Sequence, residues 1–410
     1  MPVFVSAKGA DFSAWRPAGD YVVTFRQALL DSIASSHAAA GEERLQATGA
    51  ALEELAAAND RMLAEAARIL DQMGQSSATA PLAGLTRAYF DVLYDQFELF
   101  RSPQAFFQQS HALLVQLAGT LTRLAADRIG IMSRTLPDVE LVVLGPAGRL
   151  EFSPFCPLQL VLVHGPASSA DIEVLSLFSH FIHEGFLGCG FLADSRISPR
   201  NPLWRGAPVE WELRITQGLE HGEREELIDL LRLADQAELT RNGGESGFGA
   251  RCLHLLAESR PTLAFLVTRL MGLSNGIGLM GGLRLIKTGS ERGLFALLDH
   301  ALLPLSATVT SLALIRGVTT VGTTARIREL LARGELNVDM AERLLQAWQA
   351  LHELRLDHER SLLPDWGDRL ALYLDPEKLS NNERDRLREA LETVGTAQRQ
   401  TGVIFSGLGE

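Results

Sequence analysis

Apolar residues recur every three to four positions along most of the chain, a spacing that predicts mainly helical structure. The first such stretches run over 22–73, with a break near Gly41, and over 82–133, with a break at Pro103. The polar residues 74–81 between them predict a loop. Residues 45–73 carry a heptad pattern with Asn59 in the seam, which predicts either a short coiled coil that pairs two chains or a long helix packed within its own bundle.

The pattern changes at Pro137. Short runs rich in apolar and β-branched residues at 141–144 and 158–164, separated by a turn-rich stretch, predict two strands. A helix is expected at 170–186, followed by a third strand through Phe191 and Leu192. From Glu223 onward we expect helix again, with glycine-rich interruptions at 242–249 and 272–282.

The last helix has a clear start signal. Ser380 and Glu383 have the spacing of a capping box, and Leu387, Leu391 and Val394 follow at helical spacing as an apolar stripe. We therefore predict an α+β fold that is predominantly helical. In this fold a small mixed sheet lies between an N-terminal helical region (1–104, with the coiled-coil pattern at 45–73) and a C-terminal helical domain (223–410). The sheet domain is expected to span 105–222.

Composition and charge exclude several classes of protein. A formal net charge of −12 argues against a nucleic-acid partner, since phosphate binding needs a basic face. The cysteines Cys156, Cys189 and Cys252 lie far apart, which excludes a disulfide framework or a thiolate zinc site made by this chain alone. The first residues lack the pattern of a signal peptide, and the apolar stretch 301–315 is short and contains polar residues. We therefore expect a cytoplasmic protein without a membrane partner.

The strand at 141–144 ends in the turn 145–151 (GPAGRLE). This turn resembles the nucleotidyltransferase family related to the N-terminal domain of PII-protein uridylyltransferase, which carries Gly-Ser-x-Gly-Arg-x-Glu and then Asp-x-Asp on the next strand. Residues 201–204 (NPLW) with Trp211, and the stretch 303–356, resemble later parts of the same family. The resemblance covers roughly 105–400 and implies a nucleotidyltransferase-like sheet with a helical domain after it.

In such a site the glycine turn brings backbone amides close to a triphosphate, and the paired aspartates hold two Mg²⁺ ions. Here Pro146 stands at the Ser position, and Pro157 and Gln159 stand at the Asp positions. A glutamine offers a carbonyl oxygen but no charge, so a Mg²⁺ site built on it is poor. We therefore expect no catalytic residue, no metal site and no cofactor.

Some of the motif could still bind a ligand. Gly145, Gly148 and Arg149 could meet the phosphate of a nucleotide; alternatively, the glycines serve only the turn between strands, and Arg149 pairs with Glu151. Two further acids, Asp194 and Asp235, could replace the missing metal ligands and hold Mg²⁺. Each of them is otherwise a surface or capping residue.

Two other motifs are weaker. Residues 276–281 (GIGLMG) have the spelling of a dinucleotide-binding loop, but a helix precedes them where a strand is needed, so we interpret them as a loop between helices. His180, His183 and Glu184 share one helix without the His-Glu-x-x-His order of helical zinc proteases, and we expect ordinary, partly buried histidines. The remaining histidines, His352 among them, show no constellation.

The first functional hypothesis is a nucleotidyltransferase-like signal-transduction protein that is catalytically inactive and acts through contacts with a partner protein, as a homodimer through 45–73. The second is an active uridylyl- or adenylyltransferase with substitute metal ligands. The third is a binding module that senses a nucleotide.

Overall fold

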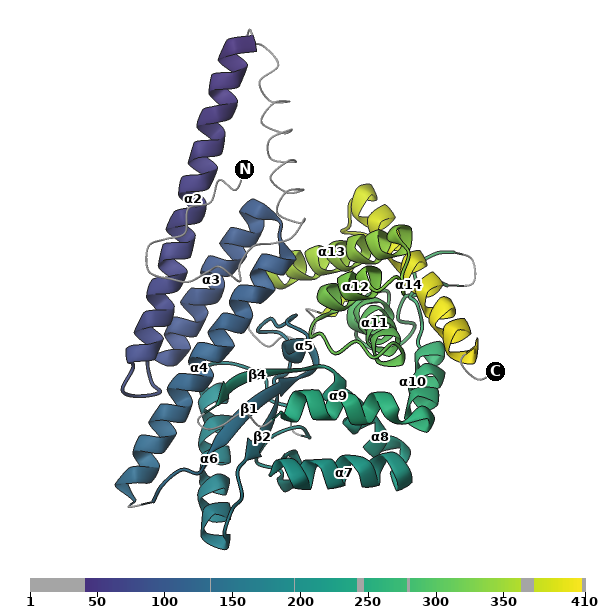
Figure 1. Cartoon of the computed structure of the whole chain (residues 1–410). Helices are drawn as coiled ribbons and strands as arrows, with labels where there is room; N and C mark the ends of the chain where they lie inside the picture. Colours follow the sequence, from purple (N-terminus) through teal and green to yellow (C-terminus); the bar gives the residue numbers. More distant parts are fainter. Residues whose placement is uncertain are drawn as a thin grey trace. The chain divides into compact units, whose positions relative to one another are not determined.

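The computed structural model describes residues 41–132, 134–194, 196–241, 247–278, 281–362 and 372–407. They divide into two compact units, one up to Thr120 and one from Leu121 onward (Figure 1). Helices predominate and the sheets are small, so the predicted α+β class is confirmed. The division of the chain at 104 and 222 stays a prediction. The first part of the predicted N-terminal helix, 22–40, lies outside the described residues.

The first unit consists of α2 (Gly41–Gln75), α3 (Leu82–Phe100) and the beginning of α4 (Pro103–Ile131). The predicted loop at 74–81 and the predicted break at Pro103 are confirmed. A buried polar chain joins the helices: the Gln109 amide donates to Gln96 Oε1, and Gln96 Nε2 donates to Asn59 Oδ1 at 2.9 Å. Asn59 is only 2% exposed and finds its partner inside its own chain, as the bundle interpretation expects. Pairing of two chains through 45–73 stays a prediction.

The second unit is built on a four-stranded sheet of order β3-β2-β1-β4. Its strands are β1 (Val139–Leu144), β2 (Gln159–His164), β3 (Arg205–Gly206) and β4 (Gln236–Arg241). β1 runs antiparallel to β2 and β4, while β2 and β3 are parallel, so the sheet is mixed as predicted. The two strands predicted from β-branched runs are confirmed.

Two predictions about the sheet are wrong. Phe191 and Leu192 form no strand, because Gly190, with φ +91°, turns the chain directly after α6 (Ser169–Gly188) and only a single bridge joins Leu158 to Ala193. β4 lies where we expected helix from Glu223 onward. It is an edge strand paired only with β1, and such strands tolerate the polar and charged side chains that mask its alternation.

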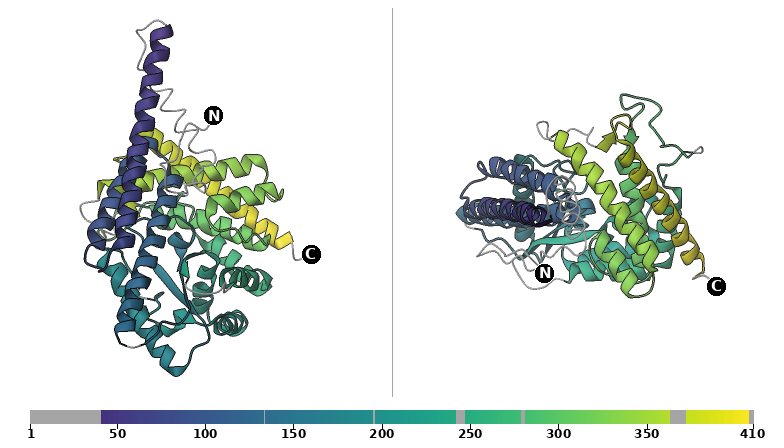
Figure 2. Two further views of the ribbon diagram at one scale, coloured as in Figure 1. Left: turned by 60° about the vertical axis from the view of Figure 1, so that its left-hand side comes forward. Right: turned by 90° about the horizontal axis from the view of Figure 1, so that it is seen from above.

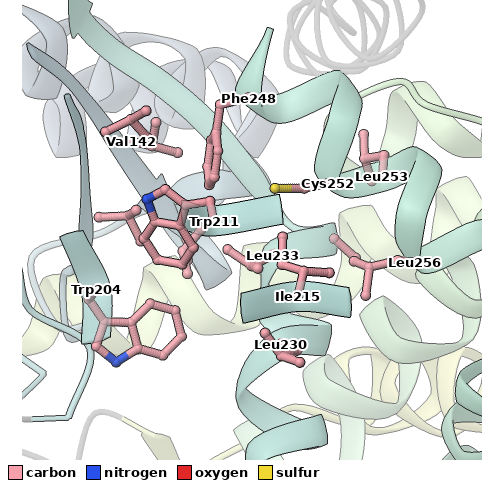
Figure 3. Packing of buried hydrophobic residues seen from close by; sticks show 14 of the residues in the cluster. Val142, Trp204, Trp211, Ile215, Leu230, Leu233, Phe248, Cys252, Leu253 and Leu256 are labelled. Carbon is pink, nitrogen blue, oxygen red and sulfur yellow. The ribbon is translucent and has the colours of Figure 1, made fainter. Parts of the chain in front are cut away.

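One face of the sheet packs against α7 (Pro208–His221), α8 (Arg224–Leu231) and α9 (Phe248–Glu258). Alternate residues of β1 and β2, Val142 and Val161 among them, point into this core. Trp211 of α7 is 1% exposed and lies between Trp204 and Phe248, with ring centroids 6.1 and 5.3 Å away (Figure 3). The two tryptophans singled out by the family resemblance thus stabilise the core. The helix α6 contributes to the opposite side, where Leu158 and Leu160 meet Phe186.

The rest of the second unit is helical. It comprises α10 (Arg260–Gly272), η4 (Leu298–Leu302), α11 (Leu303–Ile315), α12 (Thr323–Ala332), α13 (Val338–Ser361) and α14 (Asn381–Gly407), with a two-stranded sheet of β5 (Phe295–Ala296) and β6 (Tyr373–Leu374). Long helices α13 and α14 lie side by side (Figure 2). The predicted capping box is confirmed, since Glu383 N donates to Ser380 Oγ and Ser380 N donates to the Glu383 carboxylate. The stripe that follows it is buried.

One described stretch, Leu298–Ile315, is long and apolar enough to cross a membrane by length and composition. It is 67% buried inside the fold. The core helix of a soluble protein has the same properties, so this stretch is weak evidence for a membrane span.

Candidate functional site

The turn that follows β1 requires glycine at two positions. Gly145 adopts φ +63°, in the left-handed region that side chains disfavour. A Cβ on Gly148 would lie 2.1 Å from the carbonyl oxygen of Asp235, so the backbone before β4 passes too close for any side chain. Both glycines of the predicted nucleotide-binding motif therefore serve the turn itself.

Four amides of this turn have backbone acceptors. Gly145 N donates to Asp235 O at 3.0 Å, and Arg149 N donates to Gly145 O at 2.9 Å. Leu150 N and Glu151 N donate to the carbonyls of the short helix α5 (Gly145–Gly148). Pro146 has no amide hydrogen. A phosphate that approached these four amides would have to compete with the bonds they already make.

Arg149 is held between two carboxylates. Its Nε donates to Glu151 Oε2 and its Nη1 donates to Asp235 Oδ2, both at 2.9 Å, and its side chain is only 12% exposed. Burial by itself lowers the pKa of the guanidinium, but the two carboxylates more than offset this and raise it. The predicted pairing of Arg149 with Glu151 is confirmed. Asp235 joins it from the start of β4.

Asp235 also binds a second guanidinium. Arg326 of α12 donates to Asp235 Oδ1 at 2.5 Å, and Thr310 Oγ1 of α11 donates to the same oxygen at 3.0 Å. Arg326 is 1% exposed, and its other nitrogens donate to the backbone carbonyls of Thr320 and Ala234. The backbone of Asp235 caps the 3-10 helix η3 (Arg232–Ala234), as the capping interpretation expects, but its carboxylate lies inside the fold. It is the central anion of a buried network.

Glu151 is the second anion of this network. The indole nitrogen of Trp348 on α13 donates to its Oε1 at 2.8 Å, and His352 Nε2 lies 4.0 Å from the same atom. Burial raises the pKa of the Glu151 carboxyl, but the charge of Arg149 and the hydrogen bonds lower it by a larger amount. The resulting pKa is about 2. Burial lowers the pKa of His352 to about 3. Glu151 is thus ionised and His352 neutral at physiological pH.

A further ion pair supports the segment after the turn. Arg355 of α13 donates its Nε to Glu359 Oε1 at 2.7 Å and its Nη1 to the carbonyl of Glu151 at 3.1 Å. Its Nη2 reaches Ser153 Oγ and Cys156 Sγ. Arg149, Arg326 and Arg355 thus face Glu151, Asp235 and Glu359. We call these six residues the buried ion network; its charges balance.

The positions where the family has aspartates hold a different arrangement. Pro157 precedes the strand, and Gln159 begins it. Gln159 is 4% exposed, and its Nε2 donates to Asp194 Oδ2 at 2.8 Å. Its Oε1 has no hydrogen-bond partner among the described residues and points at Gly145, where a Cβ would lie 2.7 Å away. Gln159 therefore covers the turn and presents a donor to the neighbouring acid.

The two candidate substitute acids are kept apart. Leu144 of β1 pairs with Gln159 of β2 on one side and with Gln236 of β4 on the other. Asp194 binds Gln159, and Asp235 directly precedes Gln236, so the two acids lie on opposite sides of β1. Asp194 Oδ1 accepts from the amides of Arg196 and Ile197, and its Oδ2 accepts from Gln159. Among the described residues, no three His, Cys, Asp or Glu side chains form a group that could hold a metal ion. The donor set around Gln159 does not fit Mg²⁺, which prefers several oxygen ligands with carboxylates among them.

Four residues of this site are not predicted by the sequence: Arg326, Trp348, His352 and Arg355. The fold brings them to Asp235 and to the turn after β1 from α12 and α13. One local signal exists, because Arg355 and Glu359 are four residues apart on one helix and can therefore pair.

The weaker motifs have ordinary environments. In the loop 276–281, of which Leu279 and Met280 lie outside the described residues, Ile277 forms a bridge to Leu283 and Gly276 O accepts from Arg284 N. His183 Nδ1 lies 3.0 Å from Ser198 Oγ, and Glu184 pairs with Arg200 at 3.3 Å.

The helical part of the second unit is similar to a known family. Residues 260–405 match the model of the family described as "Putative nucleotidyltransferase substrate binding domain", over roughly a third of the chain. The match supports a relationship to nucleotidyltransferases for this part, as the resemblance over 303–356 predicted. It contains Trp348 and Arg355, which bind Glu151 in the turn after β1. It also contains Thr310 and Arg326, which bind Asp235 just before β4. No curated protein matches the chain.

Proposed function

We propose that this protein is a nucleotidyltransferase-like protein that transfers no nucleotide and acts in signal transduction through contacts with other proteins. The observation that carries the proposal concerns Gln159, which lies on the strand where the family carries its paired aspartates. Its side-chain amide donates a hydrogen bond to Asp194. An NH₂ group facing a carboxylate satisfies that carboxylate without a metal ion. The relation to PII-protein uridylyltransferase is part of the proposal.

The chemistry of phosphoryl transfer explains why this substitution matters. Divalent ions neutralise the charge on the phosphates and activate the attacking hydroxyl, and they need anionic oxygen ligands to stay bound. Pro157 offers no ligand from its side chain, and Gln159 offers only a neutral oxygen. We therefore propose that the site lacks the anionic ligands that would hold the divalent ions for nucleotide transfer.

The buried ion network supports a structural role for the rest of the motif. Arg149, the cation expected to meet a phosphate, already neutralises Glu151 and Asp235. A phosphate bound by Arg149 would weaken its pairing with Glu151 or with Asp235, and weakening a buried ion pair is costly. We propose that the network instead holds the sheet against the helical part that matches the substrate-binding family.

The experiment is a transfer assay on the full chain. Labelled UTP and ATP are supplied with Mg²⁺ or Mn²⁺, together with candidate protein acceptors and the chain itself. EDTA at about 10 mM, roughly a tenfold excess over the metal, removes the divalent ion and gives the background level. We expect no label in any protein above that background. Metal-dependent labelling that is lost in Asp194→Asn, or in Asp235→Asn under conditions where that variant remains folded, would establish the active alternative with substitute ligands.

One observation supports testing the active alternative: Asp194 places a carboxylate beside Gln159 of β2. A crystal grown with nucleotide and Mn²⁺ decides it: the active alternative requires an ion bound to Asp194. The nucleotide-sensing alternative requires heat on calorimetric titration with common nucleotides, and it fails if none is seen. A cytoplasmic location and a homodimer through 45–73 complete the proposal.

A further inference from the structure

Three large apolar side chains face solvent on η2 (Pro202–Trp204) and on the first two turns of α7. Leu203, Val209 and Leu213 are 63%, 77% and 57% exposed. Val209 and Leu213 are four residues apart and so share one face of α7. Arg214 Nη1 donates to the carbonyl of Leu203 at 2.5 Å, which holds η2 against this part of α7. Exposed apolar groups that gather in this way mark interaction sites.

Two guanidinium groups border these apolar side chains. Arg214 lies over the ring of Trp211, 4.5 Å from its centroid, and its Nη2 donates to the carbonyl of Arg205 at 3.3 Å. Within the described residues, neither Arg205 nor Arg214 forms an ion pair with a carboxylate. The nearest acid, Glu210, accepts from Ala207 N at 2.8 Å and acts on Arg214 only through space.

Arg205 is the second of these cations, and it is half-buried. Its Nη1 is buried and has no hydrogen-bond acceptor in the part of the chain that the structure describes. Leaving a buried charged donor unsatisfied is unfavourable, and a carboxylate is the acceptor that a guanidinium binds best. Burial lowers the pKa of Arg205 and of Arg214, as expected for cations without a close anion.

We propose that Leu203, Arg205, Val209, Leu213 and Arg214 form a docking surface, here called the α7 surface, for an acidic amphipathic segment of another protein. Apolar side chains of that segment cover the three exposed groups, and its carboxylates pair with the two arginines. The proposal deepens the proposed function, on which it rests for the role of protein contacts. It names the surface and the chemistry of the partner.

Charge selects this occupant over a second copy of the chain. In a symmetric dimer through the α7 surface, the same patch would meet itself. The arginines of both copies would then share one interface to which these five residues bring no carboxylate, and like charges across an interface are unfavourable. A partner with carboxylates beside its apolar groups satisfies both features at once.

The test is selection of binding peptides from a random displayed library of sixteen-residue sequences (on the order of four helical turns) against the full chain. We expect enriched peptides that combine aspartate or glutamate with leucine, isoleucine or phenylalanine at helical spacing. Their affinity, measured by fluorescence anisotropy, should fall at least about tenfold in Val209→Glu and in Arg205→Gln, and should weaken with added salt. Val209 is so exposed that its replacement leaves the fold intact.

The matched control is Val403→Glu on α14, where the native side chain is 73% exposed. It should bind the enriched peptides as tightly as the native chain. Enrichment of basic peptides, no enrichment at all, or equal binding by Val209→Glu would overturn the proposal. Self-association of the chain that Val209→Glu abolishes would overturn it too, since the occupant would then be a second copy.

This outcome is separable from that of the proposed function. Nucleotide transfer detected in the labelling assay would end the non-catalytic proposal without changing peptide affinity. Loss of peptide selection would end the docking proposal without producing label.

Discussion

Removing the charge of Asp235 tests the buried ion network most sharply. The change Asp235→Asn keeps the size and shape of the side chain and one carbonyl oxygen. It replaces the second oxygen with an NH₂ donor, which faces Arg149 or Arg326, groups that can only donate. Since Arg326 is 1% exposed, water cannot replace the lost anion.

The magnitude follows from burial. The Asp235 side chain is 14% exposed and that of Arg326 is 2% exposed, so solvent screens their attraction little. Removing one partner of a buried ion pair typically costs about 3–5 kcal/mol, because the other charge is left uncompensated. Arg149 keeps Glu151, and Arg326 keeps Thr310 and two carbonyls. We therefore expect about 3 kcal/mol of destabilisation, at the lower end of that range.

The assay is urea unfolding of the full chain, followed by circular dichroism and by tryptophan fluorescence. The midpoint should fall while the dependence on urea stays the same. Glu173→Gln serves as the control, because it removes a carboxylate from the exposed pair with Arg134, where 69% of the Glu173 side chain is accessible. That change should cost less than about 1 kcal/mol. If Asp235→Asn is no more destabilising than the control, the network does not stabilise the fold as argued.

Three further changes probe the same region. Gly148→Ala would place a Cβ 2.1 Å from the carbonyl of Asp235 and should cost more than about 2 kcal/mol in urea unfolding; a value near zero would mean that the turn moves freely. The pKa of Glu151 falls from 4.5 to about 2 on folding, so its contribution of about 3 kcal/mol is present above about pH 4.5 and is lost as the pH falls toward 2. Glu151→Gln should therefore flatten the acid dependence of stability between pH 5 and about 3, and an unchanged slope would contradict the assignment. Gln159→Glu puts a second carboxylate about 2.8 Å from Asp194, so one of the two must bind a proton. Relative to the native chain, this variant should lose stability as the pH rises from about 5 to 7, and a pH-independent difference would argue against the contact.

The sequence predicts elements well where its pattern is local. β1 and β2 are buried over their whole length, and each contains four consecutive apolar residues, 141–144 and 160–163, which makes them recognisable. The end of α2, the start of α4 and the start of α14 follow from loop, proline and capping signals. β4 could not be predicted, because Ala237 and Leu239 are its only apolar residues, and an alternation that short does not distinguish an edge strand from a polar helix.

The candidate site shows the same limit. Arg149 and Glu151 are two residues apart in a tight turn, so their pairing could be predicted from the sequence. Arg326 reaches Asp235 across 91 positions, and Trp348 reaches Glu151 across 197. Contacts over such separations depend on how the helices pack, and a single sequence holds no record of that. Asp235 could be noted as an acid, but its partners could not.

The central claim is that the strand carrying Gln159 no longer binds divalent metal. The most direct measurement is electron paramagnetic resonance of Mn²⁺ titrated into the full chain, with and without UTP or ATP. The account predicts that free Mn²⁺, or Mn²⁺ bound to nucleotide alone, accounts for the whole signal. Bound Mn²⁺ that disappears in Asp194→Asn would contradict it.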